Sequence, residues 1–191
     1  VVQARADMGS WAGYITDLMY CAENVDIADK VDTTETDVDT LAANIRARYL
    51  GVDYGTLNSV DHSFTDTDLY GDMDAFYLTT EMNRGGVALS TIIENYFTAG
   101  LTDASRASYF LTNRLDGMVT KDGIRSKVMS TYTGNTLIGA LESSYSLTDL
   151  SNYETLRKAC CYAFADYLFD LAGDPNGTDP VDPDPDPEPD P

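Results

Sequence analysis

Apolar residues recur three and four positions apart along most of this chain, the spacing that places side chains on one face of an α-helix. Runs that alternate apolar and polar residues, as half-buried strands do, are sparse. Capping residues and glycines separate the periodic segments. The pattern therefore predicts an all-α fold, in which residues 8–173 form a single globular domain of about seven or eight helices.

Residues that start or stop helices mark the limits of the expected elements. Ser10 and Thr102 precede apolar periodic runs as N-caps, and Gly173 follows the last run as a stop. The double glycine Gly85-Gly86 breaks the pattern in the middle of the chain. With their caps and stops, the predicted helical segments are 10–25, 37–51 (begun by Asp37 or Asp39), 65–82, 89–100, 102–117, 124–132, 135–145 and 156–173.

The segment from Thr65 to Met82 combines the most regular helical periodicity with the densest cluster of acids. We therefore predict that the rest of the chain is organised around it. Thr65 or Asp66 can cap this helix, because a short side-chain oxygen accepts hydrogen bonds from backbone N–H groups that lack a helical partner. The apolar face of the helix consists of Leu69, Met73, Phe76, Tyr77 and Thr80.

Four aspartates on this segment are the candidate functional residues. Asp66 and Asp68 fall in the first turn, where the helix dipole favours a carboxylate, and they are the candidate ligands for calcium if the protein binds a metal. Asp72 borders the apolar face, whereas Asp74 projects away from it. One interpretation is a solvated acidic side of the helix. The other makes Asp72 and Asp74 candidate catalytic carboxylates, with Asp72 at the rim of a cleft.

The single tryptophan, Trp11, lies in the first turn of the first predicted helix. Its default role is that of a core anchor. The functional alternative is a platform on which a sugar ring stacks, so Trp11 is the candidate binding residue. The 13 tyrosines allow the same two interpretations, and core packing is favoured because most of them occupy apolar helical positions.

Residues 174–191 differ in composition from the rest of the chain. They contain all seven prolines and seven acids, and no lysine or arginine. Such a sequence cannot bury apolar surface and favours an extended, disordered spacer. Similar compositions occur in linkers between modules of secreted bacterial proteins, so we expect neighbouring modules. At the other end, residues 1–7 are expected to be a frayed terminus.

The net charge of −20, from 32 acids against 12 basic residues, argues against nucleic acid and anionic membrane surfaces as partners. No apolar run approaches the roughly 18 residues that a membrane-spanning helix needs. The charge suits a soluble protein that attracts cations. The alternating acids of residues 32–39 lack the ligand spacing, the central glycine and the final glutamate of a helix–loop–helix calcium site. We therefore expect no cofactor, with calcium as the one possible exception.

Few side chains of the kind that carry nucleophilic or zinc chemistry are present. Cys21, Cys160 and Cys161 do not form a disulfide framework, and buried thiols are the favoured interpretation. The only histidine, His62, lies in an expected loop, and a catalytic triad would have to use it. Zinc is disfavoured because its sites usually need several histidine or cysteine ligands. Carboxylate chemistry remains open, since glycoside cleavage needs only two suitably placed acids.

These observations favour a noncatalytic interaction module of a secreted or surface-attached bacterial protein, binding a protein or glycan partner. The acidic spacer and the lack of a specific catalytic signature support this hypothesis. The alternative is a carboxylate-dependent glycoside hydrolase that acts on cell-wall glycan. A third possibility is a structural spacer domain without a ligand. An extracellular or cell-surface location is expected in each case.

Overall fold

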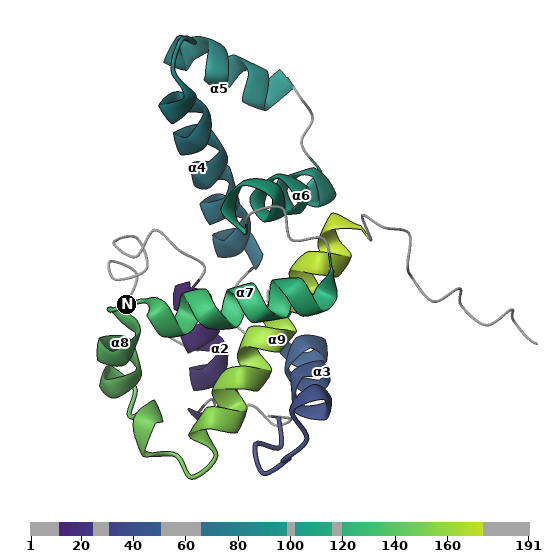
Figure 1. Cartoon of the computed structure of the whole chain (residues 1–191), viewed down its shortest axis with the longest axis vertical. Coiled ribbons are helices and arrows are strands. Elements are labelled where there is room, and N and C mark those ends of the chain that lie inside the picture. The colour runs from purple at the N-terminus through teal and green to yellow at the C-terminus, as the bar shows by residue number, and fades with distance from the viewer. Residues whose placement is uncertain (1–11, 25–30, 51–65, 99–101, 116–119, 174–191) are drawn as a thin grey trace, which may run out of the picture.

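The computed structural model of the chain describes residues 12–24, 31–50, 66–98, 102–115 and 120–173. Within these ranges the protein consists of eight α-helices and one short 3₁₀ helix, with no β-strand (Figure 1). The predicted all-α fold and the predicted number of helices are therefore confirmed. The helices are α2 (Ala12–Asn24), α3 (Val38–Tyr49), α4 (Asp66–Arg84), α5 (Leu89–Thr98), α6 (Asp103–Arg114), α7 (Lys121–Gly134), α8 (Ile138–Ser144), η2 (Leu147–Asp149) and α9 (Tyr153–Ala172).

Helix α9 is the centre of the fold. It packs against α2, α3, α6 and α7. Residues 163–169 of α9 are all buried, so the helix is enclosed on every side rather than along one stripe. The prediction that residues 65–82 organise the chain is wrong, because α4 packs mainly against α5 and α6. Regular spacing of apolar residues on one face of α4 predicts a helix that packs on one side, and not the central helix of the fold.

The molecule has two regions (Figure 1). We call α2, α3, α7, α8 and α9 the body, and α4, α5 and α6 the arm, which projects from one end of the body. The arm joins the body where α6 packs against α9. Four side chains at the base of the arm belong to the common hydrophobic core: Met73, Phe110, Leu111 and Leu115.

Side-chain caps fix several helix ends, as the sequence predicts. Asp37 begins α3 by accepting a hydrogen bond from the backbone N–H of Thr40 at 2.8 Å. Thr102 begins α6 in the same way, through the backbone N–H of Ser105 at 3.2 Å. Gly173 ends α9 with a φ of 73°, a left-handed value that residues other than glycine rarely adopt.

The turn between α4 and α5 contains the predicted double-glycine break. Gly85 and Gly86 have φ values of 73° and 83°. A Cβ at either position would meet no atom within 4 Å, so backbone conformation and not crowding requires glycine here. Two left-handed residues in succession let the chain reverse and start α5 directly after α4.

All three cysteines are buried thiols, as the sequence analysis favoured. Burial, followed by the neighbouring sulfurs of Cys161 and Cys21, raises the pKa of the Cys160 thiol well above its ordinary value. These sulfurs therefore act as small apolar groups where α2 meets α9.

Several predictions concern residues outside the described ranges. The expected frayed terminus (1–7), Trp11, His62 and the Pro-rich segment 174–191 all lie there. Their predicted roles stay predictions. In the part of the chain that the structure describes, no helix is long and apolar enough to cross a membrane.

Candidate functional site

The four candidate aspartates all lie on α4, within the arm. The backbone at Asp66, Asp68 and Asp72 is helical, but their side chains lie outside the described part of the structure. The calcium hypothesis for Asp66 and Asp68 therefore stays a prediction. Across the described residues, no group of three or more His, Cys, Asp or Glu side chains is placed to hold a metal ion.

Asp74 is engaged in an ion pair between helices. Its Oδ1 accepts a hydrogen bond from Nε of Arg106 on α6 at 2.8 Å, and each side chain is about one-quarter exposed. This pair joins α4 to α6. The catalytic hypothesis for Asp72 and Asp74 stays a prediction.

Glu81, two turns further along α4, makes the second polar connection to α6. Its Oε1 accepts hydrogen bonds from the hydroxyl of Tyr109 at 2.7 Å and from Nη1 of Arg84 at 2.6 Å. Arg84 also donates from Nη2 to Oδ1 of Asn113 at 2.9 Å. Burial and the hydrogen bond to Glu81 raise the pKa of Tyr109 to about 12, so this hydroxyl is a stable donor at neutral pH.

Tyrosine rings fill the space between the three helices of the arm. The ring of Tyr77 on α4 lies 4.6 Å from that of Tyr109 on α6 and 5.7 Å from that of Tyr96 on α5, centroid to centroid. Both pairs are tilted, a favourable geometry for aromatic rings. These aromatic and polar contacts therefore connect the described side chains of α4, α5 and α6.

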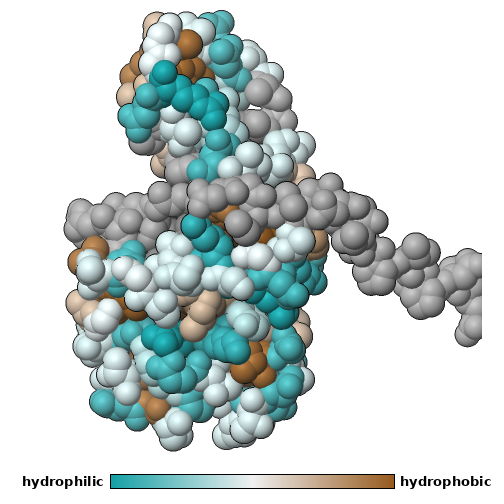
Figure 2. All heavy atoms as spheres, viewed as in Figure 1, coloured by the Kyte–Doolittle hydropathy of each residue, from teal (hydrophilic) through white to brown (hydrophobic). Residues whose placement is uncertain are grey.

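Four large aliphatic side chains of the arm are exposed at the turn from α4 to α5. Among the described residues, five large hydrophobic side chains are exposed, and four of them lie here: Met82 (50%), Val87 (53%), Leu89 (47%) and Ile93 (38%). The fifth, Leu137 (44%), lies on the body. We call the four residues the tip patch. Apolar surface is visible at the far end of the arm in Figure 2.

Helix α5 has unusually little support from the rest of the protein. Its main packing partner is α4. Ile92 is its one fully buried large side chain among those described, and Ile92 is not part of the common hydrophobic core. A ten-residue helix is marginally stable by itself in water. Among the described residues, the apolar face of α5 is therefore only partly covered.

The body contains a buried carboxylate that the sequence analysis missed. Glu142 on α8 is only 3% exposed. Its two oxygens accept hydrogen bonds from the hydroxyls of Tyr132 on α7 and Tyr153 on α9. Burial, together with the bond to Glu142, raises the pKa of both phenols far above the ordinary value. The available signal was its position four residues after Ile138, which places Glu142 on the buried face of α8.

A second buried carboxylate, Asp17 of α2, lies close to this group. Its Oδ1 accepts a hydrogen bond from the hydroxyl of Tyr145 at 3.4 Å. The hydroxyl of Thr16 is 3.2 Å from that of Tyr132, which connects the two clusters. Tyrosine hydroxyls thus join α2, α7, α8 and α9 around two acids. These hydrogen bonds tie the four helices together.

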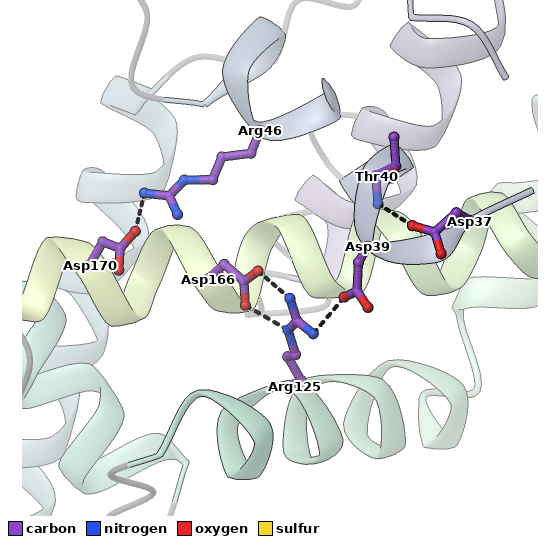
Figure 3. A network of polar contacts seen from close by, with 7 residues as sticks. All are labelled: Asp37, Asp39, Thr40, Arg46, Arg125, Asp166 and Asp170. Atoms are coloured by element: carbon purple, nitrogen blue, oxygen red, sulfur yellow. Dashed lines mark hydrogen bonds and ion pairs between the residues drawn. The ribbon is translucent and has the colours of Figure 1, made fainter. Parts of the chain in front are cut away.

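A further polar network crosses the outer side of the body (Figure 3). Arg125 of α7 donates two hydrogen bonds to Asp166 of α9, at 2.8 and 2.6 Å, and one to Asp39 of α3 at 2.8 Å. Its guanidinium also lies 4.5 Å from the ring centre of Tyr162. Arg46 and Asp170 form a second pair between α3 and α9. Asp39, Asp166 and Asp170 each pair with a guanidinium, so these ion pairs hold α3, α7 and α9 together. We call the group around Arg125 the clamp.

The tip patch differs from these polar clusters in two ways. Its side chains are apolar and exposed, and α5 packs mainly on α4 rather than on the body. Acidic residues are absent from the whole stretch 82–93, which carries a single charge at Arg84. The sequence analysis predicted helix α5 but did not single out its apolar residues as a site. The tip patch is therefore the candidate functional site, and its type is a docking surface.

Comparisons with known proteins assign a family to the chain. No curated protein and no solved structure matches it. A family model described as "YkzU uncharacterised protein" matches residues 2–175. This match covers the whole described part of the chain, both body and arm. The chain therefore belongs to the YkzU family.

Proposed function

We propose that this protein is a noncatalytic interaction module that binds a protein partner through the tip patch. The observation that carries the proposal is the gathering of four of the five exposed large hydrophobic side chains of the described residues on one turn of the arm. Exposed apolar side chains scattered singly need no explanation, whereas their gathering at one turn of the chain favours an interaction site.

The chemistry of the patch favours a protein over a glycan. Its four side chains are apolar and not aromatic, and they offer no hydroxyl or amide to a sugar. Sugar rings are usually bound by aromatic stacking with polar neighbours, and Trp11 stays the candidate for that role. A helix or strand edge with apolar side chains is the kind of partner that fits the patch.

We further propose that the module belongs to a secreted or surface-attached bacterial protein. The support comes from composition: an acidic, Pro-rich stretch follows the helical region, as in linkers between extracellular modules. The hydrolase alternative has one clear test. Wild type and Asp72→Asn are incubated with insoluble bacterial cell wall, and the release of new reducing ends is measured. If wild type releases them and the mutant does not, the protein is a hydrolase and the binding proposal is wrong.

The binding proposal is tested by affinity purification with three immobilised proteins: wild type, Leu89→Asp and Leu137→Asp. The two variants place the same charge at a similarly exposed leucine, one in the tip patch and one on the body. We expect wild type and Leu137→Asp to retain the same partner and Leu89→Asp to lose it. The partner is then purified and its affinity for each protein is measured. Equal affinity for all three proteins would remove the tip patch as the binding site.

Calcium is the one cofactor that we propose to test, at Asp66 and Asp68. Two carboxylates in the first turn of a helix supply the oxygen ligands that calcium prefers. Adding calcium to protein freed of metal by a chelator is expected to raise the Tm of wild type but not of Asp68→Asn. Equal shifts in the two proteins, or no shift in either, would contradict a site at these residues.

A further inference from the structure

Two of the three cysteines come from helices that are far apart in the sequence and packed together in the fold. Cys21 lies on α2 and Cys160 on α9, and these helices pack against one another (Figure 1). Cys21 is 4% exposed and Cys160 is completely buried, and both belong to the common hydrophobic core. The structure holds the two sulfurs as thiols in the interior of the body.

The groups around each sulfur show which of the two adjacent cysteines of α9 faces α2. Cys21 and Cys160 both lie near Tyr49, since both thiols add to the effect of burial that raises the pKa of this phenol to about 12. The Tyr49 hydroxyl also donates a hydrogen bond to the carbonyl oxygen of Cys21 at 3.2 Å. Cys161 has Glu142 of α8 among its charged neighbours instead. Because adjacent residues of a helix point about 100° apart, Cys160 faces α2 and Cys161 faces α8.

The spacing of packed helices suits a disulfide between Cys21 and Cys160. Cα atoms lie about 2.3 Å from a helix axis, and the axes of packed helices lie about 8–10 Å apart. Directly facing Cα atoms are then about 3.4–5.4 Å apart, which overlaps the range of about 4.4–6.8 Å that disulfides require. One turn after Cys160, on the same face, lies the small and fully buried Ala163. A small side chain at this position leaves room for a close approach of the helices.

We propose that Cys21 and Cys160 are a disulfide site, which joins α2 to α9 in an oxidising environment while Cys161 stays a thiol. The oxidant is a small-molecule disulfide. One protein thiolate attacks it, forms a mixed disulfide and releases one small thiol. The other protein thiolate then attacks the protein sulfur of the mixed disulfide and releases the second. Two protein thiols thus lose two protons and two electrons, and the oxidant is reduced to two thiols.

Burial decides when this bond forms. The reactive species is the thiolate, and burial, with the nearby thiols of Cys161 and Cys21, raises the pKa of Cys160 well above its ordinary value. The folded protein therefore oxidises slowly, and the bond forms while the chain folds or opens. Small thiols cannot easily reach it afterwards. The secreted or surface location proposed above supplies the oxidising conditions. The disulfide site is independent of the tip patch, so either can fail while the other stands.

The test refolds urea-unfolded, reduced protein in a mixture of reduced and oxidised glutathione. Wild type is compared with Cys160→Ala and Cys161→Ala, a matched pair because each variant removes one completely buried thiol at adjacent positions of α9. Free thiols are counted by alkylation under denaturing conditions, and mass spectrometry identifies linked peptides. We expect wild type and Cys161→Ala to contain a bond from Cys21, with one free thiol and none respectively. Cys160→Ala should keep both of its thiols.

Thermal unfolding of oxidised and reduced wild type is the second measurement. The bond closes the chain from residue 21 to residue 160, a loop that contains all three helices of the arm. Oxidation should therefore raise the Tm by about 10 °C, because it restricts the unfolded chain. Three free thiols in refolded wild type, or a bond to Cys161 in place of Cys160, would overturn the proposal. So would an oxidised protein whose Tm is no higher than that of the reduced one. The peptide map of wild type alone decides the pairing if a variant does not refold.

Discussion

The body and the arm use the same kinds of residues to different ends. In the body, α9 is surrounded by α2, α3 and α7, and its apolar side chains are consumed by the core. In the arm, α5 rests mainly on α4, and aliphatic side chains at the turn remain in contact with water. The comparison teaches that apolar side chains serve the core in the body, whereas some of them stay exposed on the arm.

The polar contacts of the two regions differ in the same way. In the body, one guanidinium joins α3, α7 and α9, and a buried glutamate joins α7, α8 and α9. In the arm, the ion pairs and hydrogen bonds connect α4 with α6 and are partly exposed. Exposed pairs contribute little to stability, whereas buried networks are costly to disturb. Mutations should therefore separate the two regions clearly.

The largest effect is expected from opening a cavity beside the centre of the body. Phe164 of α9 is fully buried. Phe164→Ala should lower the free energy of unfolding by about 3–5 kcal/mol, because transfer and cavity costs add. Urea denaturation followed by far-ultraviolet circular dichroism measures the change. A loss below about 1 kcal/mol would contradict the central place of α9.

The next effect concerns the clamp at Arg125. Arg125→Met leaves Asp166 buried without its bidentate partner and should cost about 2–4 kcal/mol. Arg125→Lys keeps the charge but loses the planar pair of donors, so it should recover only part of this. The matched change in the arm is Arg106→Met. Its pair with Asp74 is one-quarter exposed, so the loss should be about 1 kcal/mol or less.

High pH should destabilise the body through a buried phenol. Burial, with the nearby Cys21 thiol, raises the pKa of Tyr49 to about 12, above its ordinary value of about 10. The folded state therefore holds this proton more tightly than the unfolded state does. Its contribution is complete below about pH 10 and is lost as the pH rises to about 12. Denaturation midpoints measured across this range should fall less steeply in Tyr49→Phe than in wild type.

Helix caps allow a matched test of whether the arm opens separately. Asp37→Ala removes the cap of α3 in the body, and Thr102→Ala removes that of α6 in the arm. Each should cost about 1 kcal/mol. Hydrogen exchange should show faster exchange of the arm alone in Thr102→Ala, because low-stability regions open locally. Uniformly faster exchange throughout the molecule in both variants would mean that body and arm unfold together.

The smallest effect is expected at the tip patch. Ile93→Ala and Val87→Ser remove side chains that are already exposed, so stability should change by less than about 0.5 kcal/mol. The same measurements as for Phe164→Ala give the comparison directly. A loss above about 1 kcal/mol would show that the patch is part of the core, and it could not then serve as a docking surface.

The sequence pattern predicts the helices well because helices are built from local spacing and capping. The helix starts at Asp37 and Thr102, the break at Gly85-Gly86 and the stop at Gly173 all occur where the pattern places them. Each depends on a side chain or backbone conformation within a few residues.

Tertiary position is not readable in the same way. Leu89, Ile92 and Ile93 share one apolar helix face, yet only Ile92 is fully buried. Whether such a face meets another helix or water depends on distant segments of the chain. Glu142 illustrates the converse, since its burial needs the hydroxyls of Tyr132 and Tyr153 from other helices. The tip patch was missed because the exposure of its side chains depends on the tertiary fold and not on local spacing.

The distribution of the three thiols has a practical consequence for watching this protein move. Cys21, Cys160 and Cys161 all lie buried in the body, and the arm has no cysteine. A maleimide can therefore react only when the packing around these thiols opens, and the labelling rate reports that opening. When reclosing is faster than labelling, that rate reports the equilibrium population of the opened body. The wild-type chain thus carries its own chemical probe of the body and has none in the arm.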